Sequence, residues 1–399
     1  MATSFSFDQP RSKMLARYLS FLGLGLFFIA SARADTTYVY LESNIGKIPN
    51  QNSILAYKND GAGNLTAVSG SPYLTGGTGV YDPTSGPIEF DADQQVTASP
   101  DGTRLYAVEG HSNTIAAFMV NADGTLTTIA GSPFSSGGHD PVSIGFLASP
   151  ISQLVVANKN EDPNQDNSGT LPNYTTFTVN GDGSLTLNSG STLDLAFGSS
   201  PSQSLIQTRG RLHFGLEFAT SRIVSYRLRR NGLMVELSSV MPSITGDRFL
   251  GETLHPNKRI LYAGLPLSNG LAVYSYNTAG ILSPVTTVPN TGTLICWVTV
   301  NAAGTVLYSA ETGSGTVSAY DLTDARAPVL VQHFQLVGTG NKPSNLAIDP
   351  TQQFLYVLSG LKLHVLNLDA SGLMSETATP VTLPVPSDEV PLGLAVIRK

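Results

Sequence analysis

The sequence predicts an all-β protein folded as a seven-bladed β-propeller, in which the C-terminal strand completes blade one. Three observations predict this fold. A unit of four short strand-like runs joined by tight turns recurs at a period of about 50 residues, the length of one blade. Seven copies can be counted, and the last is followed by one spare strand. Four-stranded units repeated around an axis leave only short, protected sheet edges.

The clearest copy of the unit covers residues 97–134. Its first two strands flank Pro100-Asp101-Gly102, where proline fixes φ and glycine supplies the positive φ of a tight reversal. Its last two flank a second glycine-containing turn at 121–124. The segment 131–134 contains a proline, which cannot donate to a sheet ladder, so we expect the unit to end there. The predicted strands are 95–99, 103–109, 114–120 and 126–130.

The other copies repeat the same features in order. The first hairpin turn reappears at Ser149-Pro150, His255, Asn301 and Asp349, with a degenerate copy at Arg209. The third strand of each copy carries a large apolar side chain at a matching position, which predicts a repeated core. These residues are Tyr57, Phe118, Phe177, Tyr226, Tyr274, Tyr320 and Leu366.

Closure of the ring depends on the two ends of the repeat region. The first copy starts at Tyr38 and supplies a second, third and fourth strand but no innermost strand. Residues Pro391 to Ile397 match the first-strand pattern that begins at Ser344. We therefore expect the C-terminal strand to pair into blade one.

The motifs SPDGTRLYAVE, DGTLTTIAGSPF and AGTVLYSAETGSGTVSAYDL resemble those of the secreted β-propeller lactonase family and of related YVTN-type repeat propellers. That family includes bacterial 6-phosphogluconolactonase and the carboxy-muconate lactonizing enzyme. The resemblance covers nearly all of residues 36–399. It implies a seven-bladed propeller, whereas activity has to be judged residue by residue.

Residues 1–34 are expected to be a signal peptide, and residues 35–399 the propeller. Basic residues precede an apolar stretch at 18–31, and Ala32-Arg33-Ala34 has the small-x-small form of a cleavage site. The apolar stretch is shorter than the roughly 20 residues of a membrane-spanning helix. We expect a secreted protein, periplasmic or extracellular, with no membrane span after cleavage.

Composition agrees with such a protein. Only 13% of the residues are charged, and the formal net charge of −7 makes nucleic acid a poor partner. Cys296 is the single cysteine, so no disulfide can form within the chain, and its position beside Trp297 on an innermost strand predicts a buried thiol.

The connection between blades one and two, residues 73–94, is longer than a typical loop. Glu89, Asp91 and Asp93 alternate in it, so they would share one face of an extended segment. The connection is either a solvated loop or a lid over the channel mouth. Both alternatives place it at the rim that also carries the second-to-third strand turns.

Repeat positions place several more charged residues at this rim. They form either the polar edge that any propeller carries or a site for a small polar ligand or for acid–base chemistry. The candidate ligand-binding residues are Asp93, Asp140 and Lys342, and the candidate catalytic residues of an enzyme are His139, Arg248, Glu109 and Glu311.

Blade three contains an insertion with alternating oxygen-bearing side chains at Asp162, Asn164, Asp166 and Ser168. The spacing resembles the start of a calcium loop, but Asn167 replaces the invariant glycine and Asn173 replaces the twelfth-position glutamate. The insertion is therefore either a plain polar loop or a weak calcium site. We expect no other cofactor.

Blade four concentrates arginines in an otherwise acidic chain. They either form a solvated edge that discourages sheet pairing or a docking patch for an acidic polymer or partner. The residues are Arg209, Arg211, Arg222, Arg227, Arg229 and Arg230.

The resemblance implies a catalytic set that this chain does not retain. In the lactonizing relatives a His-Pro-His-Ser segment opens blade three, where this chain has Asp140-Pro141-Val142-Ser143. The relatives' arginine position is Leu250 here, with Arg248 displaced by two residues, and Pro266 stands where they carry a glutamate.

Two functions remain open. The sequence favours a secreted, monomeric, non-catalytic platform that binds a protein, a polysaccharide or a small polar ligand. The alternative is a lactone-ring hydrolase, similar to 6-phosphogluconolactonase, with a rearranged site. Loss of the acid–base set predicts no turnover of 6-phosphogluconolactone or related lactones above the spontaneous rate.

Overall fold

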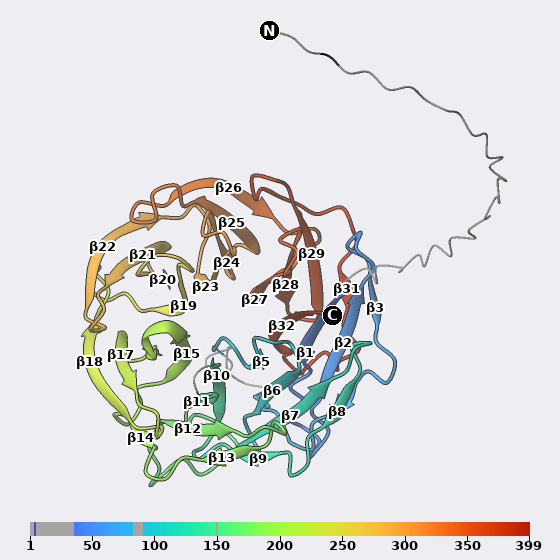
Figure 1. Ribbon diagram of the computed structural model, residues 1–399, viewed down its shortest axis with the longest axis vertical. Helices are drawn as coiled ribbons and strands as arrows, with labels where there is room; N and C mark the ends of the chain where they lie inside the picture. The colour runs from blue at the N-terminus through green and yellow to red at the C-terminus, as the bar shows by residue number, and fades with distance from the viewer. Residues whose placement is uncertain (1–3, 5–35, 83–90, 149–150) are drawn as a thin grey trace, which may run out of the picture. The chain divides into compact units, whose positions relative to one another are not determined.

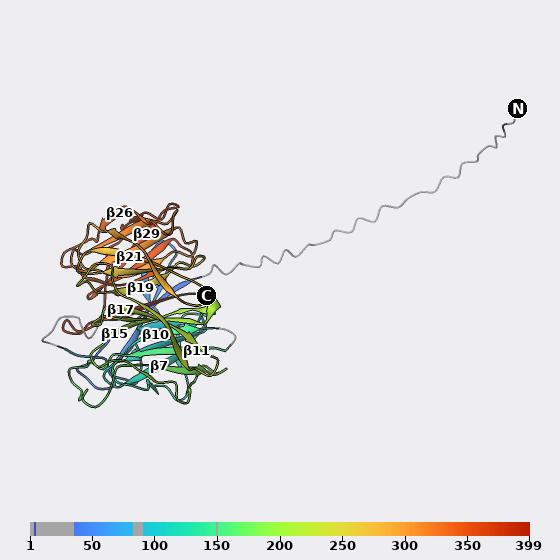
Figure 2. The ribbon, with the colours of Figure 1, turned by 90° about the vertical axis from the view of Figure 1, so that its left-hand side faces the viewer.

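The computed structural model describes residue 4 and residues 36–82, 91–148 and 151–399. The described part of residues 35–399 is all-β, with a single short 3-10 turn, η1 (Thr208–Gly210), as its helical element. Seven sheets follow one another around a central axis (Figure 1), and Figure 2 views the same ring from the side. The predicted fold class is confirmed.

The blades follow one another along the chain, and β32 returns to the first. Blade one contains β1 (Thr37–Glu42), β2 (Ser53–Asn59), β3 (Leu65–Ala67), β4 (Tyr73–Leu74) and β32 (Leu392–Arg398). Blade two contains β5 (Val96–Ala98), β6 (Arg104–Glu109), β7 (Thr114–Val120), β8 (Leu126–Thr128) and β9 (Phe134–Ser135). Blade three contains β10 (Pro141–Leu147), β11 (Gln153–Asn158), β12 (Asn173–Val179), β13 (Leu185–Leu187) and β14 (Leu193–Asp194). Blade four contains β15 (Pro201–Gln207), β16 (Leu212–Glu217), β17 (Arg222–Leu228) and β18 (Met234–Val240). Blade five contains β19 (Leu250–Leu254), β20 (Ile260–Leu265), β21 (Gly270–Tyr276) and β22 (Leu282–Pro289). Blade six contains β23 (Ile295–Val300), β24 (Val306–Glu311), β25 (Thr316–Asp321) and β26 (Val329–Gln335). Blade seven contains β27 (Pro343–Ile348), β28 (Phe354–Ser359), β29 (Lys362–Leu368), β30 (Met374–Ser375) and β31 (Val381–Thr382).

The ring closes as predicted, because β32 pairs antiparallel with β1 and forms the innermost strand of blade one. Thr37 lies opposite Arg398, and the ladder extends one residue further, where Thr36 and Lys399 exchange backbone hydrogen bonds of 2.8 and 2.9 Å. The two ends of the propeller segment therefore lie side by side.

The outer strand differs from the prediction in blade two. The chain leaves the ladder after β8, but Phe134 and Ser135 then return to pair with the start of β7 as β9. The unit therefore ends at Ser135, one residue beyond the predicted segment 131–134. Pro133, which has no N–H to donate, lies in the interruption between β8 and β9, and the outer strand resumes at Phe134.

The core is a ring of apolar clusters, one between each pair of neighbouring blades. All seven third-strand residues that the sequence predicts to face a core are buried. The apolar side chains thus hold each blade to its two neighbours, and each of these seven clusters in the described residues is shared by two blades.

A polar contact, which we call a latch, accompanies each cluster and joins a strand of one blade to the next blade. In six latches a buried hydroxyl donates to a carbonyl in the third-to-fourth strand turn of the following blade, and in the seventh an amide donates to a tyrosine hydroxyl. The latches are Tyr40–Gly124 (2.8 Å), Tyr106–Gly183 (2.9 Å), Thr176–Gly232 (3.0 Å), Ser225–Gly280 (2.6 Å), Tyr262–Ala325 (2.8 Å), Tyr308–Gly372 (2.7 Å) and Asn59–Tyr356 (2.6 Å).

The predicted signal peptide, Ser4 apart, lies outside the described residues, as do the turn at Ser149-Pro150 and Glu89 of the long connection. The stretches of chain that the structure does describe have no helix of the length and apolarity needed to cross a membrane. The domain boundary at residue 34 and cleavage there stay predictions.

Candidate functional site

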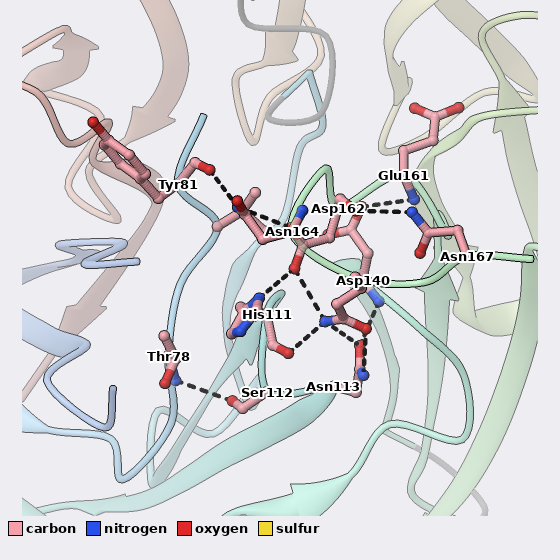
Figure 3. Close-up of polar contacts among 12 residues, drawn as sticks. Thr78, Tyr81, His111, Ser112, Asn113, Asp140, Glu161, Asp162, Asn164 and Asn167 are labelled. Atoms are coloured by element: carbon pink, nitrogen blue, oxygen red, sulfur yellow. Dashed lines mark hydrogen bonds and ion pairs between the residues drawn. The ribbon is translucent and has the colours of Figure 1, made fainter. Parts of the chain in front are cut away.

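Three connections meet at one rim of the ring, above blades two and three. They are the turn between β6 and β7, the blade-three insertion between β11 and β12, and the start of the long connection after β4. Thr78 N donates to Ser112 Oγ at 3.0 Å, and Asn164 Nδ2 donates to Tyr81 O at 2.5 Å (Figure 3). The second-to-third and fourth-to-first connections therefore form one continuous surface here.

A histidine and a buried carboxylate pair at the centre of this surface. His111 Nδ1 and Asp162 Oδ2 are 2.6 Å apart, and Figure 3 shows the two side chains pointing toward each other. The Asp162 side chain is fully buried, whereas the imidazole of His111 is 37% exposed. No described residue bonds to His111 Nε2, so that nitrogen faces solvent. We call this pair the dyad.

The insertion holds Asp162 by hydrogen bonds from its own residues. Asn164 N donates to Asp162 Oδ1 at 2.8 Å, and Gln165 Nε2 donates to Asp162 Oδ2 at 3.0 Å. Asn113 Nδ2, from the facing turn, donates to Gln165 Oε1 at 2.9 Å. Because these donors surround a buried anion, they fix the orientation of the carboxylate and hence of the imidazole.

Asp140 lies beneath the dyad at the start of blade three. Its backbone adopts φ 53°, a left-handed conformation that Asp tolerates, and its N donates to Asn113 Oδ1 at 2.7 Å. Glu161 N donates to Oδ2 at 3.3 Å, while Oδ1 is buried without a hydrogen-bond partner. Burial raises the pKa of Asp140 to about 7, and nearby Lys159 opposes that rise. Asp140 therefore gains and loses its proton near neutral pH.

The end of the long connection fills the central channel. Asp93 N donates to Ser202 O at 3.1 Å, and the Asp93 carboxylate accepts from Asn345 Nδ2 at 3.1 Å and from Gln203 Nε2 at 3.4 Å. These partners belong to blades seven and four, on different sides of the ring. Residues 91–94 therefore form a plug, and burial raises the pKa of Asp93 to about 6.

A buried lysine joins the plug to the dyad surface. Lys159 Nζ donates to Asp91 O at 3.3 Å and lies 3.6 Å from Glu161 Oε2, with its own side chain fully buried. Burial raises the pKa of Asp91 to about 6, which the positive charge of Lys159 partly offsets. The described plug residues are thus neither a solvated loop nor an outer lid.

Two buried glutamates share one amide between blades one and two. Asn52 Nδ2 donates to Glu42 Oε1 at 2.5 Å and to Glu109 Oε2 at 2.8 Å, and the remaining oxygen of each carboxyl group has no hydrogen-bond partner. Burial raises the pKa of Glu109 to about 8. Burial and the neighbouring Glu109 raise the pKa of Glu42 well above its usual value. At neutral pH the Glu109 carboxyl group therefore holds its proton.

This proton uptake predicts that stability falls as pH rises. Between pH 4.5 and about 8 the folded chain keeps the Glu109 proton that the unfolded chain releases. One such group lowers the free energy of unfolding by about 1.4 kcal/mol per pH unit in that window. The free energy of unfolding, measured with urea from pH 5 to 7.5, should therefore fall less steeply with pH in Glu109→Gln than in wild type, by about 1.4 kcal/mol per pH unit. Glu236→Gln, whose side chain is 54% exposed, should keep the wild-type slope, and an equal slope in Glu109→Gln would contradict the assignment.

The comparisons with known proteins agree with the fold. The family model described as "Lactonase, 7-bladed beta-propeller" matches residues 73–388. The chain belongs to this lactonase family. No curated protein matches it in sequence.

Solved structures similar to this lactonase-family propeller cover most of the chain. A Lactobacillus plantarum protein aligns with a TM-score of 0.70 and 16% identity, over 91% of this chain and 99% of its own. A Bacteroides uniformis protein assigned as a 6-phosphogluconolactonase aligns with a TM-score of 0.67 and 17% identity, over 92% of this chain and 99% of its own. The Pseudomonas aeruginosa periplasmic gluconolactonase aligns with a TM-score of 0.66 and 18% identity, over 89% of this chain and 99% of its own. At these identities the likeness establishes the fold alone.

The candidate residues of this lactonase-family propeller do not gather at one point. Asp140 lies below the dyad, and His139 precedes it with Nδ1 buried and without a partner. Arg248 lies over the Phe218 ring of blade four, at 5.0 Å. Glu311 is buried in blade six among Asn290, Ser309 and Thr316, and burial raises its pKa to about 7. Asp93 lies in the plug and Lys342 is exposed in blade seven.

The calcium candidates of the lactonase-family chain are engaged within their own loop. Asp162 accepts from His111 and Asn164, and the exposed Asp166 accepts from Ser168 N at 2.9 Å. In the described ranges no group of three or more His, Cys, Asp or Glu side chains is placed to hold a metal. Calcium binding stays a prediction.

Sequence reasoning missed His111, the histidine of the dyad. His111 lies two residues beyond Glu109, in the second-to-third turn that repeat logic places at the rim, and this position was the available signal. Lys159 was missed because nothing in the local sequence marks a lysine for burial.

Proposed function

We propose that this lactonase-family protein hydrolyses a neutral sugar lactone of the gluconolactone type, with His111 as the general base. The observation that carries the proposal is the dyad: a partly exposed imidazole whose Nδ1 is held 2.6 Å from a buried carboxylate. The family and the names of two structural relatives support the same reaction class.

The dyad has the arrangement that lactone opening requires. Neutral His111 Nε2 would take a proton from water while the water oxygen bonds to the lactone carbonyl carbon. Asp162 would stabilise the imidazolium that forms, through the hydrogen bond to Nδ1. The imidazolium would then return its proton to the ring oxygen as the C–O bond breaks, and the product is the hydroxy acid. Nothing besides water is consumed.

The charges around the dyad favour an uncharged lactone over a phosphorylated one. Glu161 is partly exposed on this surface, Asp140 and Asp162 are buried directly beneath it, and the nearby lysine, Lys159, is buried beside Glu161 and Asp91. A phosphate group here would meet carboxylates. An exported location, which the N-terminal pattern predicts and which the periplasmic relative shares, favours the same substrate class.

The test measures loss of glucono-1,5-lactone with purified protein. Wild type should give saturable hydrolysis above the spontaneous rate, and His111→Asn should lower kcat by about a hundredfold to ten-thousandfold, as for loss of a general base. Imidazole added to His111→Ala should restore part of the rate, an effect that no structural role would give. His333→Asn is the matched control, because its ring is 33% exposed and lies 4.0 Å from a buried glutamate. Turnover that persists in His111→Asn would refute the assignment.

A second candidate is the non-catalytic platform that binds a protein, a polysaccharide or a small polar ligand. The plug favours it, since residues 91–94 occupy the channel, and so does the absence of the relatives' acid–base set at Asp140, Val142 and Pro266. If wild type shows no hydrolysis of glucono-1,5-lactone but the lactone raises its melting temperature, this second function replaces the first.

A further inference from the structure

The opposite rim carries a groove that the dyad does not use. First-to-second and third-to-fourth strand turns line it, starting with a cavity of about 660 Å³ between blades four and five. A second cavity of about 560 Å³ shares Lys258, Arg259 and Tyr276 with the first and extends to the blade-six turn. We call the two together the basic groove.

The charges along this groove are mostly positive. Arg209, Lys258 and Arg259 line the first cavity, which has no carboxylate among its lining residues. The second adds Arg326 and one acid, Asp324. Among the described residues none of the four cations makes an ion pair, and all this lies on a chain of net charge −7. The groove therefore concentrates positive potential that the protein itself does not neutralise.

Two turns that present these cations are fixed by side-chain hydrogen bonds. Gln207 Oε1 accepts from Gly210 N at 2.6 Å and caps η1, which carries Arg209. His255 is buried, and its Nδ1 accepts from the backbone N of Asn257 and of Lys258, both at 3.1 Å. The backbones beneath the cations are thus ordered before any ligand arrives, which lowers the entropy cost of binding.

One of the blade-four arginines ties the walls of the groove together. Arg227 donates to Gly210 O at 2.6 Å and, across the blade interface, to Thr278 O and Ala279 O at 3.2 Å each. Arg211 is likewise occupied, by Leu228 O at 2.9 Å and by Gln153. Arg227 therefore has a structural role in the groove, Arg211 has one beside it, and Arg209 lines the groove itself.

We propose that the basic groove binds a linear acidic polysaccharide of the uronate type. Its cations are spread over blades four, five and six, which suits charges repeated along a chain better than a single phosphate. The neutral lining residues Gln207, Asn257 and Asn277 offer amides to hydroxyl groups. Its aromatic residue, Tyr276, is 6% exposed and offers no face for stacking bases, which single-stranded nucleic acids use.

The test is titration of the protein with a short oligogalacturonate at low and high salt. Binding should weaken as salt rises. Arg209→Gln, Lys258→Gln and Arg259→Gln should each raise Kd about fivefold, and the triple variant about a hundredfold. All three side chains are exposed, so melting temperatures should stay at the wild-type value.

Controls separate the groove from overall charge. Lys58→Gln removes an exposed cation from blade one and should leave Kd unchanged, as should His111→Asn on the opposite rim. A neutral malto-oligosaccharide of equal length should not bind. The proposal is overturned if oligogalacturonate does not bind at low salt, if Lys58→Gln weakens binding as much as the groove variants do, or if a single-stranded oligonucleotide of equal charge binds more tightly.

Discussion

A chain that ends at Val390 should not form a monomeric propeller. Deleting residues 391–399 removes β32, whose Leu394, Ala395, Val396 and Ile397 pack into the clusters on both sides of blade one. Burying one large apolar side chain contributes about 1.5–3 kcal/mol, so the loss is comparable with the whole stability of a typical domain, about 5–15 kcal/mol. It also leaves the inner edge of β1 unpaired, and exposed edges promote aggregation.

Size-exclusion chromatography with light scattering, together with thermal unfolding, measures this outcome. We expect oligomers or aggregates in place of the monomer. A synthetic peptide of residues 391–399, added during refolding, should restore monomer because it can occupy the vacant inner position. A truncated protein that stays monomeric with an unchanged melting temperature would show that β32 does not complete the ring.

Gly251→Ala should destabilise the ring by about 2–5 kcal/mol. Gly251 lies on β19 with φ +69°, a conformation that costs other residues about 1–2 kcal/mol. A Cβ there would lie 2.2 Å from the backbone oxygen of Cys296 and 2.9 Å from Trp297 Cα. Neither atom belongs to a flexible side chain, so blades five and six would have to separate, and overpacking of this kind costs about 1–3 kcal/mol more.

Gly198→Ala is the matched control for this substitution. Gly198 has the same φ of +69°, but no atom lies within 4 Å of a Cβ built there. It should therefore lose only the conformational contribution, about 1–2 kcal/mol. Urea unfolding of both variants isolates the contact at the blade interface, and equal losses would contradict close packing between the two innermost strands.

The fold was predictable because each blade repeats its own local signals. Within each repeat of about 50 residues, turns such as Pro100-Asp101-Gly102 indicate the order of the strands, and large apolar residues such as Phe118 indicate which strand face lies in the core. Closure was predictable from the same repeat, because Pro391 to Ile397 match a first-strand pattern that blade one lacks. The return of β9 to its sheet was not predicted, because a proline was expected to end the pairing, although the Gly-Ser-Pro-aromatic segment at 131–134 repeats the one at 70–73 that leads into β4.

The site was less predictable, because its contacts join distant segments of the chain. Repeat positions give the rim at which a residue lies but not its distance from residues of other blades, so Arg248, Glu311 and Asp140 appeared equivalent. The plug could not be foreseen, because Asp93 binds Gln203 and Asn345 across the ring. An acidic, glycine-rich connection has the composition of a solvated loop, and only the channel around it makes burial possible.

The side-by-side ends of the propeller segment have a mechanical consequence. Thr36 and Lys399 form the first pair of the β1–β32 ladder, so tension applied between them pulls perpendicular to the two strands. The hydrogen-bonded pairs would then break one after another. If the strands were pulled along their length, the pairs would instead carry the load together. The ring would therefore open at low force when pulled by its ends, and always at blade one.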